Sequence, residues 1–304
     1  MVILVTGGAG YIGSIVVEEL LRQDYSVVVV DNLQEGNRGS VLAGVSFYEG
    51  DVGDRGLLDQ IFTDHPIEVV LHFAAETTIE FSMTDPAKYF NNNVVHGMTL
   101  LEVMRDFNCN RFIFSSTAAT FGEPQYTPID EKHPQLPINA YGESKLMFEH
   151  ILDWYHRAYG LKYNAFRYFN AAGASERLGE AHRHESHLIP VIIQMALGQL
   201  EKFSIFGNDY STKDGTCIRD YIHVTDLAQA HILALENLDE HPNGKYNLGN
   251  GAGFSNLEVV KMVERVSGKK IYYEFAERRK GDPAVLIASS ELAKKELSWQ
   301  PKFP

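Results

Sequence analysis

The chain has 304 residues, of which 44% are hydrophobic, and a formal net charge of −13 at pH 7. This length predicts a globular protein with one large domain or two. The negative charge and the lack of a long run of Lys or Arg argue against nucleic acid and anionic membrane surfaces as partners. No apolar run reaches the about 20 residues that a membrane helix needs. Only two cysteines occur, Cys109 and Cys217, without CxxC spacing, so we expect neither a disulfide framework nor a zinc site, and we expect a cytoplasmic protein.

The first predicted element is a buried parallel strand at 2–5, where four apolar residues follow one another. It leads into the turn TGGAGYIG, and residues 14–22 then have the pattern of an amphipathic helix. Strand, glycine turn and helix in this order are typical of a dinucleotide-binding site. Gly7, Gly10 and Gly13 are expected to permit the tight turn, backbone approach to a pyrophosphate, and close packing of the helix on the strand.

Acidic residues follow the next two predicted strands. The strand at 26–30 ends at Asp31 and Asn32, about 20 residues after the glycines, where an acid is expected to bond the ribose diol of a dinucleotide. A carboxylate there repels a 2′-phosphate, so NAD is favoured over NADP. The strand at 45–48 is followed by Asp51, which can accept a hydrogen bond from adenine or cap a helix; the sequence leaves both open.

The next elements bring small and polar residues to the same edge of the sheet. A strand at 68–73 is followed by two alanines, small enough for a cofactor to lie against the backbone. A long helix is predicted over 85–107, and because asparagine is unfavourable within a helix, we expect Asn93 to reach inward. A strand at 111–115 leads to a run of hydroxyl residues that includes Thr117, which is expected to face the ligand crevice.

Tyr141 and Lys145 stand four residues apart at the opening of a helix predicted over 143–159. At this spacing both side chains leave one helix face, so the lysine charge is expected to lower a phenol pKa that is ordinarily about 10. Tyr141 is therefore a candidate base, although the same pair also occurs on solvated helices. A sixth strand at 162–167 completes an alternation that predicts an α/β fold with a Rossmann-like, doubly wound parallel sheet.

Together these segments resemble the extended short-chain dehydrogenase/reductase superfamily, through TGGAGYIG with its downstream acid, SSTAATFG, YGESK and RYFN. Within it, the UDP-glucose 4-epimerases are similar in IFGNDYSTKDGTCIRDYIHVTDLA at 205–228, YNLGNG at 246–251 and RRKGDPA at 278–284. The likeness spans nearly the whole chain. It implies an NAD-binding domain at 1–169 and a smaller C-terminal α/β domain at 170–304 that binds a nucleotide sugar and is partly interleaved with the first.

The resemblance implies reversible inversion at carbon 4 of a UDP-hexose, with NAD as a tightly bound cofactor. Tyr141 is then the base, Lys145 holds the nicotinamide ribose and lowers the phenol pKa, and Thr117 supplies an active-site hydroxyl. Hydride leaves carbon 4 for NAD, the 4-keto sugar turns over, and hydride returns to its other face. The cofactor must therefore stay bound through the cycle.

The expected cofactor contacts lie at the glycine turn, the strand ends and the catalytic helix: Gly7, Gly10, Tyr11, Ile12, Gly13, Asp31, Asn32, Asp51, Val52, Phe73, Ala74, Asn93, Tyr141, Lys145 and Phe169. The nucleotide-sugar contacts carry over to Thr117, Tyr141, Asn170, His187, Leu188, Ser204, Ile205, Phe206, Arg219, Arg279 and Asp282. Two arginines suit a diphosphate because their forks bind phosphate oxygens bidentately. Asp282 has a second interpretation, as the salt-bridge partner of Arg279.

Three features depart from this simple assignment. His182, His184 and His187 cluster in sequence, but neither a cysteine nor an HExxH helix accompanies them, so no metal is expected. Glu76 stands in the segment where the family often has a lysine that reaches the cofactor. Leu286 occupies the position that gates the sugar pocket, and its intermediate bulk leaves acceptance of N-acetylhexosamines open.

Three alternative functions differ in the residues they require. A 4-epimerase of UDP-N-acetylhexosamine or of a UDP-pentose would keep every motif. A nucleotide-sugar 4,6-dehydratase needs an acid and a base beside Thr117, where Ala118 and Ala119 stand. A non-enzymatic NAD-binding protein would keep the glycines without needing both Tyr141 and Lys145.

The helices predicted over 85–107 and 143–159 lie where the superfamily builds a four-helix bundle between two copies of the chain. We therefore predict a homodimer. The side chains expected on that surface are aromatic residues and methionines that core packing would explain equally well: Met98, Met104, Met147, Phe148 and Trp154.

Overall fold

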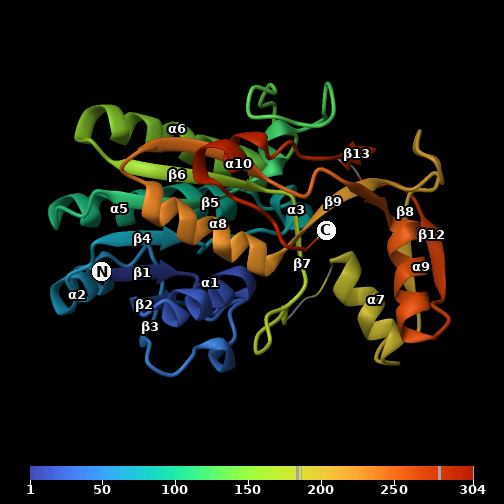
Figure 1. The fold of residues 1–304 in the computed structure, drawn as a ribbon, viewed down its shortest axis with the longest axis horizontal. Coiled ribbons are helices and arrows are strands. Elements are labelled where there is room, and N and C mark those ends of the chain that lie inside the picture. The colour runs from blue at the N-terminus through green and yellow to red at the C-terminus, as the bar shows by residue number, and fades with distance from the viewer. Residues whose placement is uncertain (183–184, 186, 280–281, 304) are drawn as a thin grey trace.

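The computed structural model describes residues 1–182, 185, 187–279 and 282–303. Its centre is a seven-stranded parallel sheet with strand order β10-β6-β5-β4-β1-β2-β3 (Figure 1). These strands are β1 Val2–Thr6, β2 Ser26–Asp31, β3 Ser46–Glu49, β4 Val69–His72, β5 Arg111–Thr117, β6 Lys162–Tyr168 and β10 Asn243–Leu248. The predicted doubly wound parallel sheet is confirmed, and β10, which pairs with β6, adds an edge strand that the prediction lacked.

Helices cover both faces of this sheet. One face carries α1 Tyr11–Arg22, α8 Val224–Asn237 and α10 Glu291–Leu297, and the other carries α2 Arg55–Asp64, α5 Gly97–Asp106 and α6 Ala140–Tyr159. Within β1, Ile3 and Val5 belong to the first core cluster and Leu4 to the second. Because successive side chains point to opposite faces, a strand covered on both sides must be apolar throughout, which explains the unbroken apolar run at 2–5.

The helix predicted over 85–107 is helical but not uniform. It consists of α4 Pro86–Phe90, a π-helical segment, η2 Asn91–His96, and α5, with the short α3 Ile79–Ser82 before it. Asn93 lies in the π segment and is 2% exposed, with its amide nitrogen 3.0 Å from both the Glu76 carbonyl and Ser144 Oγ. The prediction that Asn93 reaches inward is confirmed; that of a regular α-helix is wrong there. Widened turns of this kind often mark functional sites.

A smaller group of elements lies beyond the carboxyl ends of the large sheet, with α7, α9, β8 and β12 at the right of Figure 1. Its strands are β7 Asn170–Ala172, β8 Phe203–Phe206, β9 Ile218–His223, β11 Gly253–Ser255, β12 Tyr273–Ala276 and β13 Val285–Leu286, and its helices are α7 Leu188–Ala196 and α9 Asn256–Ser267. β9 pairs with β7, β11 and β13, while β8 pairs with β12. The described residues also include the 3-10 turns η1 Arg38–Ser40 and η3 Ala118–Phe121. None of the helices described is both long and apolar enough to cross a membrane.

The last described residues pack onto α8. Trp299 is 0% exposed, and its Nε1 donates to the Asp226 carbonyl at 2.9 Å. The Asp226 carboxylate in turn accepts the backbone N–H groups of Lys302 and Phe303 at 2.9 and 3.0 Å. One acidic residue on α8 therefore holds this segment through both its backbone and its side chain.

Replacing Trp299 with alanine is expected to lower the free energy of unfolding by about 3–5 kcal/mol, because it empties a fully buried site. The matched control is Tyr272→Ala, since the Tyr272 side chain is 68% exposed and its loss is expected to change stability by less than about 0.5 kcal/mol. Urea unfolding followed by circular dichroism measures both. Equal losses in the two variants would contradict the packing described for the chain end.

Candidate active site

The predicted site residues gather where the parallel strands of the large sheet end. Gly7 follows β1, Asp31 ends β2, Ala74 follows β4 and Thr117 ends β5. β1 lies between β2 and β4, so the strand order reverses at this point. In a doubly wound sheet, ligands bind in the crevice that such a reversal opens at the carboxyl ends.

The three glycines of the turn have distinct surroundings. Gly7 has a φ of +70°, and a Cβ there would lie 2.6 Å from the Ala74 nitrogen, so both the turn and its contact with the end of β4 require glycine. A Cβ on Gly13 would lie 2.3 Å from the Gly7 oxygen, whereas one on Gly10 would meet only that oxygen, at 3.3 Å. Gly10 thus leaves room for a ligand to approach the start of α1, as a pyrophosphate requires.

Asp31 is held beside this turn. It is 7% exposed; its Oδ2 accepts the Ala9 N–H at 2.9 Å and its Oδ1 accepts the Leu33 N–H at 2.8 Å. Burial raises the pKa of its carboxyl group, against the effect of these two backbone bonds. The carboxylate is therefore positioned by backbone donors beside the glycine turn.

Asn32 and Asp51, both predicted at the adenosine end, contact each other. The Asn32 amide donates to Asp51 Oδ2 at 3.1 Å, and His96 Nδ1 lies 2.8 Å from Asp51 Oδ1. The alternative that Asp51 caps a helix is wrong, because α2 is capped by Asp54, whose side chain accepts the Leu57 N–H.

The remaining contacts predicted here are apolar: Ile12 and Phe73 pack on the α1–α8 cluster, and Val52 and Ala74 on the α2–α5–α6 cluster.

The first turn of α6 places Tyr141 beside Thr117. α6 begins at Ala140, three residues earlier than predicted, and the Asn139 side chain caps it by accepting the Gly142 N–H at 2.8 Å. A Cβ on Gly142 would lie 2.4 Å from the carbonyl oxygen of Ala119 in η3. This close approach lets the Thr117 hydroxyl hydrogen-bond the Tyr141 phenol, a contact that acts to lower the phenol pKa.

The electrostatics of Tyr141 and Lys145 differ from the prediction. Burial raises the pKa of the Tyr141 phenol despite the Thr117 hydrogen bond, and burial lowers the pKa of Lys145 to about 7, opposed by the charge of Glu149. Lys145 Nζ donates to the Ser115 carbonyl at 2.8 Å and lies 4.8 Å from the centre of the Phe114 ring. The ammonium is therefore engaged with β5, and in the chain alone it does not lower the phenol pKa.

A buried ion pair stands behind Lys145 and was not predicted. Glu149 and Arg167 are 0% and 2% exposed, and two parallel hydrogen bonds of 2.6 and 3.0 Å join them. The Ser116 hydroxyl also donates a hydrogen bond to Glu149 Oε1, with 2.6 Å between the two oxygens. The available signal was the acid one helical turn after Lys145, on the same face of α6.

On the nucleotide-sugar side, the structure assigns Asp282 a different partner from the one expected. Asp282 forms an ion pair with Arg219, which also donates to the Pro283 carbonyl at 2.8 Å. The guanidinium of Arg279 instead lies 4.1 Å from the centre of the Phe206 ring at the end of β8, where Ser204 and Ile205 precede it. The alternative that Asp282 serves as the salt-bridge partner of Arg279 is therefore wrong, and the prediction that Asp282 contacts the nucleotide sugar stays untested.

Three further predicted positions lie after β6, at the start of β7 and just before α7. The Asn170 amide donates to the Asp220 carbonyl at 3.0 Å, and Phe169 is buried in one cluster with Ala118 and the partly buried Leu286. His187 directly precedes Leu188, the first residue of α7, and its Nδ1 lies 2.8 Å from carboxylate oxygens of Glu180 and Glu185. These glutamates were overlooked in the sequence, and His184 lies outside the described residues.

The chain is similar in sequence to a family of known proteins. The sequence profile of the NAD dependent epimerase/dehydratase family matches residues 3–249. The chain belongs to this family. Among its curated relatives, the UDP-glucose 4-epimerase of Halalkalibacterium halodurans is 54% identical, in an alignment covering 100% of this chain and 92% of that protein.

Solved structures of the family agree with the fold. A crystal structure of a UDP-glucose 4-epimerase matches with a TM-score of 0.96 and 51% identity, covering 100% of this chain and 93% of the other. A second, from Bifidobacterium longum in complex with NAD+ and UDP, matches with a TM-score of 0.96 and 38% identity, covering 100% and 94% of the two chains.

One departure from the family resemblance has a structural explanation. The Glu76 carboxylate accepts a hydrogen bond from Gln34 at 2.7 Å and pairs with Lys88 Nζ at 2.8 Å. The Glu76 backbone is bonded at both N–H and C=O by the Asn93 amide. A lysine thus does reach this segment, but it comes from α4 and is neutralised by Glu76, while the Asn93 amide is engaged with protein groups.

The glycine turn yields a test that separates cofactor binding from folding. Gly10→Ala is expected to fold with a smaller loss of stability than Gly13→Ala, because its added Cβ meets one atom, the Gly7 oxygen, at 3.3 Å. It is expected to bind NAD at least about tenfold more weakly, since the methyl group fills the pyrophosphate approach. Gly13→Ala serves as the contrast, because its Cβ would collide with the Gly7 carbonyl and lower the melting temperature. Calorimetric NAD titration and thermal unfolding measure the two effects. Unchanged NAD affinity in Gly10→Ala would contradict this assignment.

Proposed function

We propose that the protein inverts the configuration at carbon 4 of a UDP-hexose, interconverting UDP-glucose and UDP-galactose with tightly bound NAD. The observation that carries the proposal is the partly buried Tyr141 side chain, whose phenol is hydrogen-bonded to Thr117 at the carboxyl end of β5, in a chain of this family. Tyr141 takes the proton of the sugar 4-hydroxyl and later returns it. Thr117 orients the phenol and the 4-hydroxyl oxygen.

NAD held at this site would supply the redox chemistry, as the acceptor and donor of hydride at carbon 4, and its positive ring would favour the phenolate. The chain raises the phenol pKa by burial, so Tyr141 becomes an effective base only when additional positive charge lies close by. Lys145 is buried against β5, where its ammonium can hold the nicotinamide ribose. This arrangement couples proton removal to occupation of the cofactor site.

The carboxyl ends of the large sheet are proposed to hold NAD, and the elements beyond them the nucleotide sugar. We assign residues 1–169 to cofactor binding and 170–304 to substrate binding, with the second part interleaved because α8 and β10 return to the large sheet. Asp31 favours NAD because a carboxylate beside the turn repels a 2′-phosphate. The cofactor-binding set is Gly7, Gly10, Tyr11, Ile12, Gly13, Asp31, Asn32, Asp51, Val52, Phe73, Ala74, Asn93, Tyr141, Lys145 and Phe169.

The UDP group is proposed to lie against the smaller group of elements. Arg219 and Arg279 supply positive charge beside the loop that carries Asp282, and the Arg279 stacking on Phe206 holds its planar fork ready for phosphate oxygens. The remaining contacts are Asn170 after β6, His187 and Leu188 before and at the start of α7, and Ser204, Ile205 and Phe206 on β8. Each of these roles is an inference from position and chemistry.

The residues around Thr117 help to decide which reaction the site can perform. Ala118 and Ala119 follow Thr117 and have no proton to transfer, which disfavours a 4,6-dehydratase. Leu286 packs in the cluster of Phe169 and Ala118, so its side chain is suited to limit the size of the sugar. A 4-epimerase of UDP-N-acetylhexosamine or a UDP-pentose therefore remains the second candidate.

Purified protein incubated with UDP-galactose is expected to reach an equilibrium mixture with UDP-glucose, and a parallel incubation with UDP-N-acetylgalactosamine decides the second candidate. Tyr141→Phe is expected to bind NAD and UDP yet lose conversion by at least about 100-fold, because it removes the proton acceptor. Chromatography of the nucleotide sugars and calorimetric binding measure both properties.

Tyr126→Phe is the matched control, since its hydroxyl contacts Asp130 at an exposed position, and it is expected to keep full activity. If neither sugar interconverts while NAD is bound, the proposed activity fails. Full activity in Tyr141→Phe would remove Tyr141 from its role without excluding the reaction.

The assembly is proposed to be a homodimer formed by α5 and α6 of two copies. Met98, Met147 and Trp154 on these helices are 39%, 40% and 65% exposed, which supports an apolar surface available for a second copy. Met104 and Phe148, expected on the same surface, are instead buried in the core at 1% and 0% exposed. The interface therefore uses the outer faces of both helices.

A Met147→Glu/Trp154→Glu variant is expected to sediment as a monomer, because two carboxylates would be buried in an apolar interface. Val266→Glu on α9, where the side chain is 79% exposed, should leave the sedimentation coefficient unchanged. A wild-type protein that sediments as a monomer at micromolar concentration would reject the dimer.

Composition supports a limited set of partners and a cellular location. The charge of −13 disfavours binding to nucleic acid or to an anionic membrane surface. Cys109 and Cys217 are both free and buried thiols, which accords with a reducing cytoplasm.

A further inference from the structure

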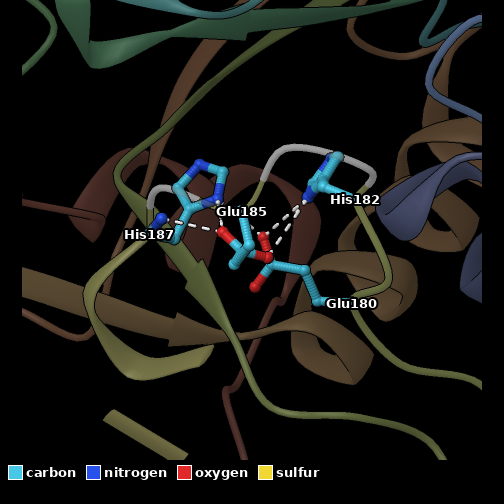
Figure 2. A group of neighbouring side chains, drawn as sticks. All are labelled: Glu180, His182, Glu185 and His187. Atoms are coloured by element: carbon cyan, nitrogen blue, oxygen red, sulfur yellow. Dashed lines mark hydrogen bonds and ion pairs between the residues drawn. The ribbon is translucent and has the colours of Figure 1, made fainter. Parts of the chain in front are cut away.

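Four metal-binding side chains converge in the loop between β7 and α7. Glu180, His182, Glu185 and His187 each offer a ligand atom, and these atoms lie within 4.8 Å of one another. Figure 2 shows the two carboxylates lying between the two imidazole rings. The spacing of two, three and two residues lets one short loop fold around a common centre.

Carboxylate oxygens and imidazole nitrogens alternate around this centre. Glu180 Oε1 lies 3.0 Å from His182 Nδ1 and 2.8 Å from His187 Nδ1, and Glu185 places Oε1 2.8 Å from His187 Nδ1 and Oε2 3.8 Å from His182 Nδ1. A tetrahedral ion with bonds of about 2.0–2.2 Å separates neighbouring ligand atoms by about 3.3–3.6 Å. Three of the four separations are shorter than this range and one is longer, so the ligand atoms would have to shift by up to about half an ångström to bring these contacts into it.

The charge balance of the cluster favours a cation. The side chains of Glu180 and Glu185 are only 10% and 7% exposed, and no lysine or arginine in the described part of the chain forms an ion pair with either. Two shielded carboxylates require compensating positive charge. Among the residues that the structure describes, that charge can come from protons on both imidazoles or from one divalent cation bound by neutral imidazoles.

We propose that Glu180, His182, Glu185 and His187 form a structural site for a divalent transition-metal ion of the zinc class. Two imidazole nitrogens with two carboxylate oxygens suit zinc, whereas magnesium and calcium prefer oxygen ligands alone. Four protein ligands fill a tetrahedral zinc ion and leave no position for substrate, so the role is structural. The His187 side chain is 62% exposed, which opens the centre to an ion from solvent.

The proposal departs from the expectation of no metal, which stays untested, and the reason is specific. Neither a cysteine nor an HExxH motif accompanies the histidines, because the second pair of ligands is Glu180 and Glu185. The proposal is independent of the epimerase activity, because metal content can be measured without turnover.

The position of the loop gives the ion a consequence for the cofactor site. Ala181 and His182 line one cavity together with Gly10 and Tyr11 of the glycine turn. The Tyr11 and His182 rings are nearly perpendicular, with their centroids 6.4 Å apart. The Tyr11 hydroxyl donates to the Gly173 carbonyl at 2.6 Å. A bound ion would therefore fix the loop that lies over the turn proposed to hold the pyrophosphate.

The test measures metal content of the full chain, produced without a histidine tag, after dialysis against zinc or cobalt and then metal-free buffer. Elemental mass spectrometry is expected to find about one ion per chain, and the cobalt form should show the intense visible absorption of tetrahedral coordination. A His182→Ala/Glu185→Gln variant is expected to lose both signals. His182→Cys should keep zinc, because a thiolate also binds it.

The matched control is His150→Ala/Glu123→Gln, a pair of exposed residues outside the loop, which should retain the ion. Circular dichroism of each variant verifies that it is folded, and the folded His182→Cys variant decides the question if the double variant is not. No retained zinc or cobalt in the wild type would overturn the proposal in favour of a cluster held by protons. Retention by the folded His182→Ala/Glu185→Gln variant would overturn it as well, because the ion would then be bound elsewhere.

Discussion

The active-site side of the sheet depends on the buried ion pair between Glu149 and Arg167. Glu149 projects from α6, Arg167 from β6, and the Ser116 hydroxyl that Glu149 also bonds comes from β5. Breaking such a pair leaves a buried charge uncompensated and typically costs about 3–5 kcal/mol. The pair therefore fixes the rotation of α6 about its axis and its height above β5, which determines where Tyr141 meets Thr117.

The burial around Tyr141 and Lys145 also shifts the pKa values of both side chains. In the chain alone both groups are driven toward their neutral forms, because burial raises the Tyr141 pKa and lowers that of Lys145 to about 7. Glu149 opposes this for Lys145 by placing a negative charge one helical turn away. A positive ligand ring beside the phenol would act in the corresponding way on Tyr141. If Tyr141 is the base, as proposed, the raised phenol pKa makes it effective only once positive charge occupies the crevice.

Local signals predicted the sheet and the cofactor side, because each depends on a few adjacent residues. The run at 2–5, the turn glycines and Asp31 follow from backbone sterics and strand alternation, and the structure places them together. Partnerships across long sequence distances were not predictable in this way. Asp282 pairs with Arg219, 63 residues away, rather than with nearby Arg279, and no spacing rule selects between them.

Other misses arose where local preference was overridden by packing. Asn91–His96 widens into a π turn because the Asn93 amide bonds Glu76 and Ser144, contacts that a helical pattern does not reveal. Met104 and Phe148 lie on helix faces that α5 and α6 bury against the sheet. β10 joins that sheet's edge from a distant part of the chain, where only tertiary pairing assigns it a neighbour.

The loop before α7 joins the two halves of the proposed site. Its first part meets Tyr11 at the start of α1, and its last residue, His187, precedes Leu188 at the start of α7, where the nucleotide is proposed to bind. The Glu180–His187 contact closes the loop between these points at 2.8 Å. The described residues of this loop therefore link the glycine turn to the start of α7 through short contacts. Cofactor retention and nucleotide binding are therefore expected to be coupled through this loop, whichever positive charge neutralises its carboxylates.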